Sequence, residues 1–274
     1  MPIDYKQFIH PEDQSAMEKL KAIPLLDTVT KKFLENFHED LLHGINMVSK
    51  VKIDSNQLPA LYGLLIETCN CLQLPLPEFY VEMDPNPNAY TFGDTNPFIV
   101  INSGLIDLMT TDEIKAIIAH ECGHILCHHV LYHSLATYLT KAGGIVGSIF
   151  GAGFISAPLR WALQYWVRRS EFSADRVAAY VMQDATVVSR TMMHLAGGAS
   201  KIVGDINLDL ILEQAAEYNR FISKFGKSKV LQYLEVRDMD HPYPALRAME
   251  VQKWYKSFQP KNSISDLKSS KLNW

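Results

Sequence analysis

Twelve residues near the middle of the chain, Ala116 to Cys127, constrain the fold more than any other segment. The stretch is apolar on nearly every face of a helical wheel, which is typical of a helix buried in a protein core. Apart from two thiols, its titratable groups are His120, Glu121 and His124. Burying a carboxylate and two imidazoles without partners is costly, so the fold must supply groups that compensate them.

The composition indicates a globular chain with a large core. Of 274 residues, 47% are hydrophobic and 20% are charged, which excludes a disordered or fibrous protein. The formal net charge is −4 and no basic run occurs, so nucleic acid is not expected as a partner. The four cysteines form no regular framework, which favours reduced thiols and a cytoplasmic location.

The patterning predicts a mainly α protein with a small mixed β-sheet, an α+β fold. Thr110 and Glu113 form a capping-box signature, so a long helix is expected from about Thr111 to Lys141. Other helices are expected over 27–50, 58–72, 161–182, 207–224 and 244–256, and strands over 78–83, 89–92 and 98–101. We divide the chain into an N-terminal helical region (1–74), a main domain that contains the buried helix (75–258) and a tail (259–274).

The spacing within the buried helix predicts a metal site. His120 and His124 are four residues apart, so both rings project from one side and can bind one tetrahedral Zn²⁺. Glu121 adjoins the first ligand and can reach a water at the metal without binding the metal itself. This is the His-Glu-x-x-His arrangement of zinc hydrolases, and the alternative is a pair of hydrogen-bonded core histidines. Gly123, in mid-helix, indicates that some group approaches the helix closely.

A third ligand must come from elsewhere in the chain. His128, His129 and His133 continue the same predicted helix, and ligands along one straight stripe cannot converge on one ion. Glu171 is the best candidate, and Asp175, one turn later, could accept the free ring N–H of a zinc-bound histidine. Spacing alone leaves open an alternative, in which the two carboxylates form a surface pair bridged to an arginine.

Several motifs in order carry a family resemblance. They are His-Glu-Cys-Gly-His at 120–124, Glu-Phe-Ser-Ala-Asp at 171–175, His241-Pro242 and Arg247, preceded by Asn88-Ala89-Tyr90 and Ile-Asn-Ser-Gly-Leu at 101–105. Over about 75–250 the chain resembles the gluzincin family of HtpX and the CAAX prenyl endopeptidases. The resemblance implies a zincin-type metallopeptidase domain with one zinc ion, held by His120, His124 and Glu171.

The resemblance also implies an activity. It predicts a zinc endopeptidase in which Glu121 is the general base and His241 lies near the oxyanion. An extended polypeptide would add as a strand beside Asn88, Ala89 and Tyr90, with Arg247 also near the substrate. Two alternatives remain, a zinc-site polypeptide-binding module of chaperone type with little turnover, and a zinc hydrolase of a non-peptide substrate.

The segment between the two metal-binding motifs is unusual. Residues 142–159 carry no charge but contain five glycines and Pro158. A single membrane crossing there would separate Glu171 from His120, so we expect a glycine-rich flap or helical hairpin over the cleft. Peripheral contact of 142–167 with the cytoplasmic side of a membrane is expected through four aromatic residues, Phe150, Phe154, Trp161 and Trp166.

Overall fold

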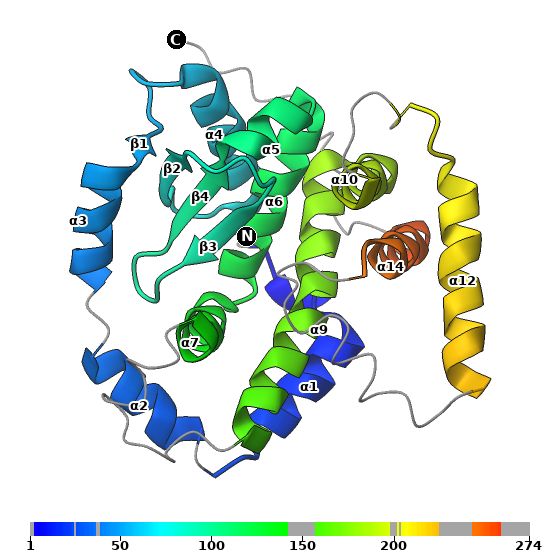
Figure 1. Ribbon diagram of the computed structural model, residues 1–274, viewed down its shortest axis with the longest axis horizontal. Helices are drawn as coiled ribbons and strands as arrows, with labels where there is room; N and C mark the ends of the chain where they lie inside the picture. The colour runs from blue at the N-terminus through cyan, green and yellow to red at the C-terminus, as the bar shows by residue number, and fades with distance from the viewer. Residues whose placement is uncertain are drawn as a thin grey trace.

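Helices dominate the structure, and one small sheet lies among them (Figure 1). The computed structural model describes residues 3–24, 26–36, 39–141, 157–197, 202, 204–224 and 243–258. The helices are α1 (Pro11–Lys21), α2 (Leu26–Asn36), α3 (Glu39–Ser49), α4 (Pro59–Leu72), α5 (Ser103–Leu108), α6 (Thr111–Leu126), α7 (Val130–Lys141), α9 (Ala157–Met182), α10 (Ala185–Gly197), α12 (Leu208–Lys224) and α14 (Pro244–Ser257). The strands are β1 (Val51–Lys52), β2 (Glu78–Glu82), β3 (Ala89–Phe92) and β4 (Phe98–Asn102). The predicted α+β class is confirmed.

The sheet is mixed and has the strand order β1-β2-β4-β3. β2 and β4 are parallel, with Glu78 opposite Phe98, whereas β3 is antiparallel to β4, with Ala89 opposite Ile101. All five residues of β4 are buried, as expected for a central strand covered on both faces. β3 is therefore an edge strand, and helices α6 and α7 contact it.

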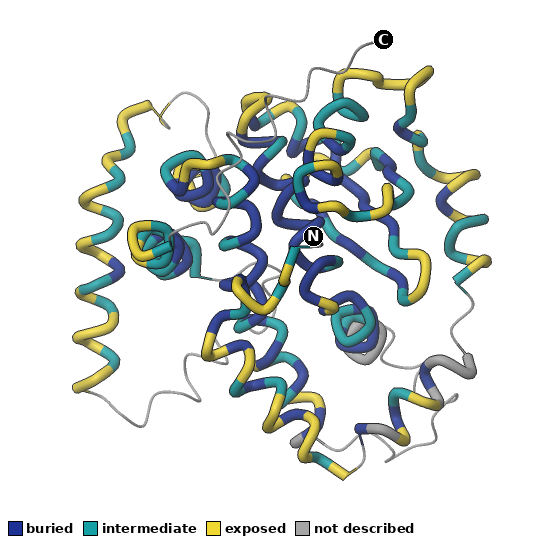
Figure 2. Tube along the Cα trace, turned by 180° about the vertical axis from the view of Figure 1, so that it is seen from behind, coloured by how far each residue is buried: buried dark blue, intermediate teal, exposed yellow. Residues whose placement is uncertain are grey.

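Helix α6 begins where the sequence predicts. The side chain of Thr110 accepts from the backbone N–H of Glu113, and the Glu113 carboxylate accepts from the backbone N–H of Thr110 at 2.8 Å. Of the 16 residues of α6, 12 are buried, which confirms a core helix. Figure 2 shows buried residues gathered along the central helices, whereas α12 at one side is exposed along most of its length.

Gly123 marks a close approach between α6 and α9. A Cβ atom at this position would lie 3.0 Å from the Cα atom and 3.1 Å from the carbonyl oxygen of Ala174. Glycine lets the two backbones meet at this point, because any side chain would have to displace them. The close neighbour that the sequence predicts at Gly123 is thus helix α9.

The expectation of one helix from Thr111 to Lys141 is wrong. α6 ends at Leu126, and His128 adopts a left-handed backbone conformation with φ of 59°. The backbone N–H of His129 then donates to the carbonyl of His124 at 2.9 Å, and α7 leaves in a new direction (Figure 1). The sequence gives no sign of this break, since helices usually end at a glycine or proline. Here a histidine adopts the left-handed conformation that usually favours glycine.

Other boundaries differ in smaller ways. The helix expected over 27–50 is two helices, α2 and α3, with residues 37–38 between them outside the described chain. The sequence does not predict α10, nor α1, which lies along α9 and contacts it (Figure 1). The division into regions 1–74, 75–258 and 259–274 stays a prediction.

Part of the uncharged segment lies outside the described residues. Residues 142–156, with Phe150 and Phe154, cannot be compared with the predicted flap, whereas 157–167 form the start of α9. Trp161 is 51% exposed, but Trp166 is completely buried and so is not available to a membrane surface. No helix within the described ranges has the length and the apolar character needed to cross a bilayer.

Two glycine variants test the contact between α6 and α9. We expect Gly123→Ala to lower the free energy of unfolding by about 1–2 kcal/mol, because overpacking outweighs the gain in helix propensity. Gly63→Ala in α4 is the matched control, since nothing lies within 4 Å of its added methyl group. It should raise the free energy of unfolding by about 0.5–1 kcal/mol. Urea unfolding of metal-free protein measures both, and equal stabilisation by the two variants would contradict the close approach.

Candidate metal centre and catalytic site

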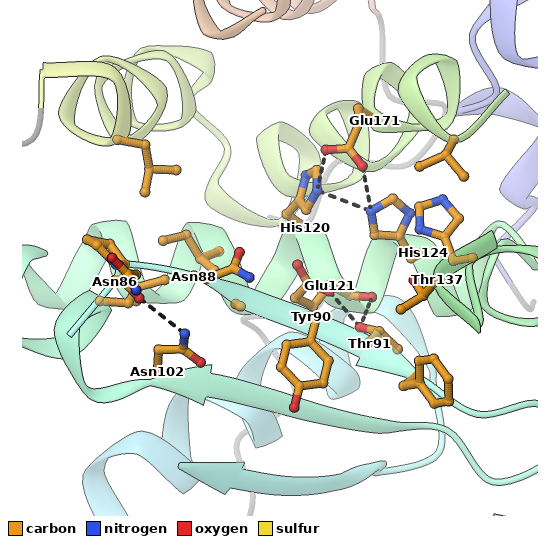
Figure 3. A pocket seen from close by; sticks show the side chains of 18 of the residues that line it. Asn86, Asn88, Tyr90, Thr91, Asn102, His120, Glu121, His124, Thr137 and Glu171 are labelled. Carbon is orange, nitrogen blue, oxygen red and sulfur yellow. Dashed lines mark hydrogen bonds and ion pairs between the residues drawn. The ribbon is translucent and has the colours of Figure 1, made fainter. Parts of the chain in front are cut away.

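Three buried side chains from two helices converge at one point (Figure 3). α6 presents His120 and His124, whose Nε2 atoms lie 3.2 Å apart. α9 presents Glu171, whose Oε2 lies 3.4 Å from Nε2 of His120 and whose Oε1 lies 3.4 Å from Nε2 of His124. All three residues are buried. The structure therefore brings together the three residues predicted as ligands.

The spacing of these atoms fits a small divalent ion. Two ligand atoms about 2.0–2.1 Å from a tetrahedral zinc ion lie about 3.3 Å from each other. The observed separations, 3.2 Å between the imidazoles and 3.4 Å from each imidazole to the carboxylate, match that value. Two imidazoles and one carboxylate are also a donor set that leaves a fourth position for a reacting molecule.

Asp175 and Arg247 support this group from behind. Oδ1 of Asp175 lies 2.9 Å from Nδ1 of His120, as the sequence predicts for an acceptor of the ring N–H. Arg247, from α14, donates to both oxygens of Asp175, at 2.8 Å and 2.6 Å, and lies 3.0 Å from Oε2 of Glu171. The expected contact of Arg247 with substrate stays a prediction, since its guanidinium lines the cavity but is held by two carboxylates.

Burial and charge set the pKa values of the site in opposite directions. Burial lowers the pKa of His120, but hydrogen bonds to Asp175 and Glu171 and their charges raise it to about 10. His124 has its pKa lowered, because burial outweighs its contact with Glu171. Burial alone would raise the pKa of Asp175. The charge and hydrogen bonds of Arg247 and His120 have the larger, opposite effect, so the pKa lies below its ordinary value and Asp175 is charged.

Glu121 lies beside the ligands and is almost completely buried, at 2% exposed. The hydroxyl of Thr91, on strand β3, donates to Oε2 of Glu121 at 2.7 Å (Figure 3). Thr91 fixes the carboxylate, and sequence reasoning missed it because a threonine in a strand gives no signal of such a role.

One cavity of about 1330 Å³ contains the whole group. Its lining includes His120, Glu121, His124, Glu171 and the three residues expected at the substrate, Asn88, Ala89 and Tyr90. Apolar residues of α3 and α10 also line it, among them Ile45 and Met192. His241 lies outside the described residues, so its expected place at the oxyanion stays a prediction.

The break after α6 brings other histidines to the site. The rings of His129 and His133 lie with their centroids 5.3 Å and 4.5 Å from that of His124. The prediction that these side chains continue along a straight helix away from the metal is wrong, because the left-handed turn at His128 redirects them. The sequence signal was present in the cluster of histidines, but the turn was not foreseen.

Comparison with known proteins places this geometry in a family. Residues 64–255 match the model of peptidase family M48. The chain belongs to peptidase family M48. Its members are metalloproteases, in agreement with the resemblance to HtpX, so the chain is a protease with a metal site.

Similarity to one relative extends beyond the residues that match the M48 model. Over 264 residues the chain is 36% identical to the plastoglobule-localized metallopeptidase 48, chloroplastic, of Arabidopsis thaliana, covering 96% of this chain and 76% of the relative. It is 31% identical over 108 residues to a protease HtpX homolog of Campylobacter hominis, covering 38% of each chain. It is 22% identical over 178 residues to protease HtpX homolog 2 of Methanosarcina mazei, covering 56% of this chain and 60% of that protein. No solved structure matches.

Proton release tests the charge state of the metal-free site. His120, with a pKa of about 10, carries two ring protons at pH 6, and a metal ion must displace one of them. We expect zinc binding at pH 6 to release about one proton per chain, and zinc affinity to rise with pH until His120 is neutral. Calorimetric titrations at pH 6 in two buffers of different ionisation enthalpy count the protons. Binding without proton release would show that His120 is already neutral.

Proposed function

We propose that the protein is a zinc-dependent endopeptidase that hydrolyses extended or unfolded polypeptides. One observation carries the proposal, the convergence of His120, His124 and Glu171 with Glu121 in a single cavity beside the edge strand β3. The three donors fit a zinc ion in spacing and in chemistry.

The residues of the site then have separate roles. His120, His124 and Glu171 hold the metal, which when bound polarises water and the scissile carbonyl. Glu121 takes the proton of the attacking water and passes it to the leaving amine. Because Thr91 donates to Oε2 of Glu121, the proposed proton acceptor is the other oxygen, Oε1. Asp175 holds the ring proton of His120 at Nδ1, so Nε2 of His120 keeps its lone pair for the metal.

The substrate class follows from the place of strand β3. β3 is at the edge of the sheet and lines the same cavity as the ligands, so we place the substrate backbone beside Asn88, Ala89 and Tyr90. Strand addition requires an extended segment, which favours unfolded chains or exposed loops over compact domains. Zinc-dependent cleavage of casein would separate an endopeptidase from a binding module and from a hydrolase of small esters or amides.

Exchanging Glu121 for glutamine separates catalysis from metal binding. We expect Glu121→Gln to keep one zinc ion per chain and to lose at least about a hundredfold in casein cleavage, because the amide cannot accept a proton. His124→Ala and Glu171→Ala should lose both zinc and activity. Glu67→Gln makes the same exchange at a side chain that is 63% exposed and should leave both unchanged. Near-normal cleavage by Glu121→Gln would rule out this mechanism.

A second exchange tests the role implied for His241. If its side chain stabilises the oxyanion, His241→Ala should lower kcat by about tenfold or more with an unchanged zinc content. Metal analysis beside steady-state kinetics on one fluorogenic peptide gives both values. Loss of zinc from His241→Ala would instead make His241 a ligand and displace Glu171 from that role.

A further inference from the structure

A buried chain of side chains runs from His124 to the N-terminal helix. Nδ1 of His124 lies 3.1 Å from Nδ1 of His129, which belongs to the turn after α6. On the other side of the His129 ring, Nε2 lies 3.1 Å from Oδ2 of Asp13 in α1, an ion-pair contact that is not a well-aligned hydrogen bond. All three residues are at most 3% exposed. The chain of contacts thus joins a predicted metal ligand to a carboxylate far away in the sequence.

Metal binding would fix the ring protons along this chain. When Nε2 of His124 offers its lone pair to a metal, the ring proton of His124 lies on Nδ1. Two imidazole nitrogens 3.1 Å apart need one proton between them, so His124 donates and Nδ1 of His129 accepts. The proton of His129 is then on Nε2, facing the carboxylate of Asp13. Each ring therefore has one tautomer that satisfies its neighbours on both sides.

Hydrogen bonds from two side chains orient the carboxylate of Asp13. Its Oδ1 accepts from the indole N–H of Trp166 at 2.8 Å, and its Oδ2 accepts from the hydroxyl of Ser173 at 2.6 Å. Ser173 in turn accepts from the backbone N–H of His10 at 2.9 Å. Burial alone would raise the pKa of Asp13. Its contacts with His129, Ser173 and Trp166 have the larger, opposite effect, so the pKa lies below its ordinary value and the carboxylate is charged.

The other predicted histidine ligand has a shorter version of the same arrangement. Nδ1 of His120 meets the carboxylate of Asp175 directly, at 2.9 Å. Among the residues that the structure describes, the printed contact of Nδ1 of His124 is with His129 and not with a carboxylate. Asp13 lies outside residues 64–255, which match the family model. The contacts through His129 therefore connect helix α1 to the site.

We infer that Asp13 and His129 position the metal ligand His124, holding its ring orientation and its tautomer from helix α1. The inference rests on the proposed metal site. Partners of this kind fix a ligand ring and make it more basic, and their loss commonly weakens metal affinity by about 10–100-fold.

A different assignment uses some of the same atoms. His124, His129 and His133 also lie within reach of one another and could surround a second ion. That arrangement would bind metal to both nitrogens of His124 and would require a deprotonated imidazolate. It would also remove the only ring proton available between His124 and His129. A second ion is therefore the less favourable assignment, and its stoichiometry makes it testable.

Zinc affinity of the full chain tests the inference. Dissociation constants come from competition with a fluorescent chelator, on variants shown by circular dichroism to be folded. We expect Asp13→Asn and His129→Leu to bind zinc about 10–100-fold more weakly. His129→Gln should bind more tightly than His129→Leu, because its amide oxygen can still accept from Nδ1 of His124. The visible spectrum of the Co²⁺ form should shift in His129→Leu and less in His129→Gln.

A matched control separates positioning from general stability. Glu113→Gln changes a different buried carboxylate that also contacts a histidine, since Oε2 of Glu113 in α6 lies 3.1 Å from Nδ1 of His194. This variant should leave zinc affinity unchanged. If Asp13→Asn does not fold, the difference between His129→Leu and His129→Gln decides the question.

Several results would overturn the inference. Wild-type zinc affinity in folded Asp13→Asn, or equal affinity in both His129 variants, would show that the contacts from His124 through His129 to Asp13 only stabilise the core. Two zinc ions per wild-type chain, with one lost in His129→Leu, would make His129 a ligand. Zinc binding that survives His124→Ala would instead overturn the proposed metal site itself.

Discussion

The contact between α6 and α9 at Gly123 and Ala174 determines whether this protein has a site at all. Two of the converging side chains belong to α6 and the third, Glu171, belongs to α9. Metal–ligand bonds tolerate errors of only a few tenths of an ångström, whereas a single added methyl group would press against the backbone of the opposite helix. The metal centre can therefore have the correct geometry only if α6 and α9 pack as closely as they do at Gly123.

The same closeness creates an electrostatic demand. Glu121, Glu171 and Asp175 are buried together, and Arg247 pairs with Glu171 and Asp175. With neutral imidazoles, these three carboxylates and the guanidinium of Arg247 carry an excess of negative charge that a bound divalent cation would offset. In the metal-free protein a proton on His120 meets part of that demand, which is why its pKa rises to about 10 despite burial. Metal and proton compete for the same buried charge.

Sequence patterns predicted the features that depend on a single helix. The four-residue spacing of His120 and His124 is a property of one helix, and the capping box located its start. Glu171 and Asp175 came from an ordered set of motifs, since spacing alone left open a surface pair. The contacts that sequence could not supply are those made across the fold. Thr91 reaches Glu121 from a strand, and Asp13 reaches His129 from α1, with no periodicity to connect them. The direction of α7 was also missed, since His128 takes a left-handed conformation that its residue type does not announce.

The support of the site is spread over most of the chain, from Asp13 in α1 to Arg247 in α14. A ribosome that synthesises this protein therefore releases the ligand histidines long before it has made the arginine that pairs with Glu171 and Asp175. On the proposed chemistry, a nascent chain that ends before residue 247 holds a centre in which Glu171 and Asp175 still lack this cationic partner.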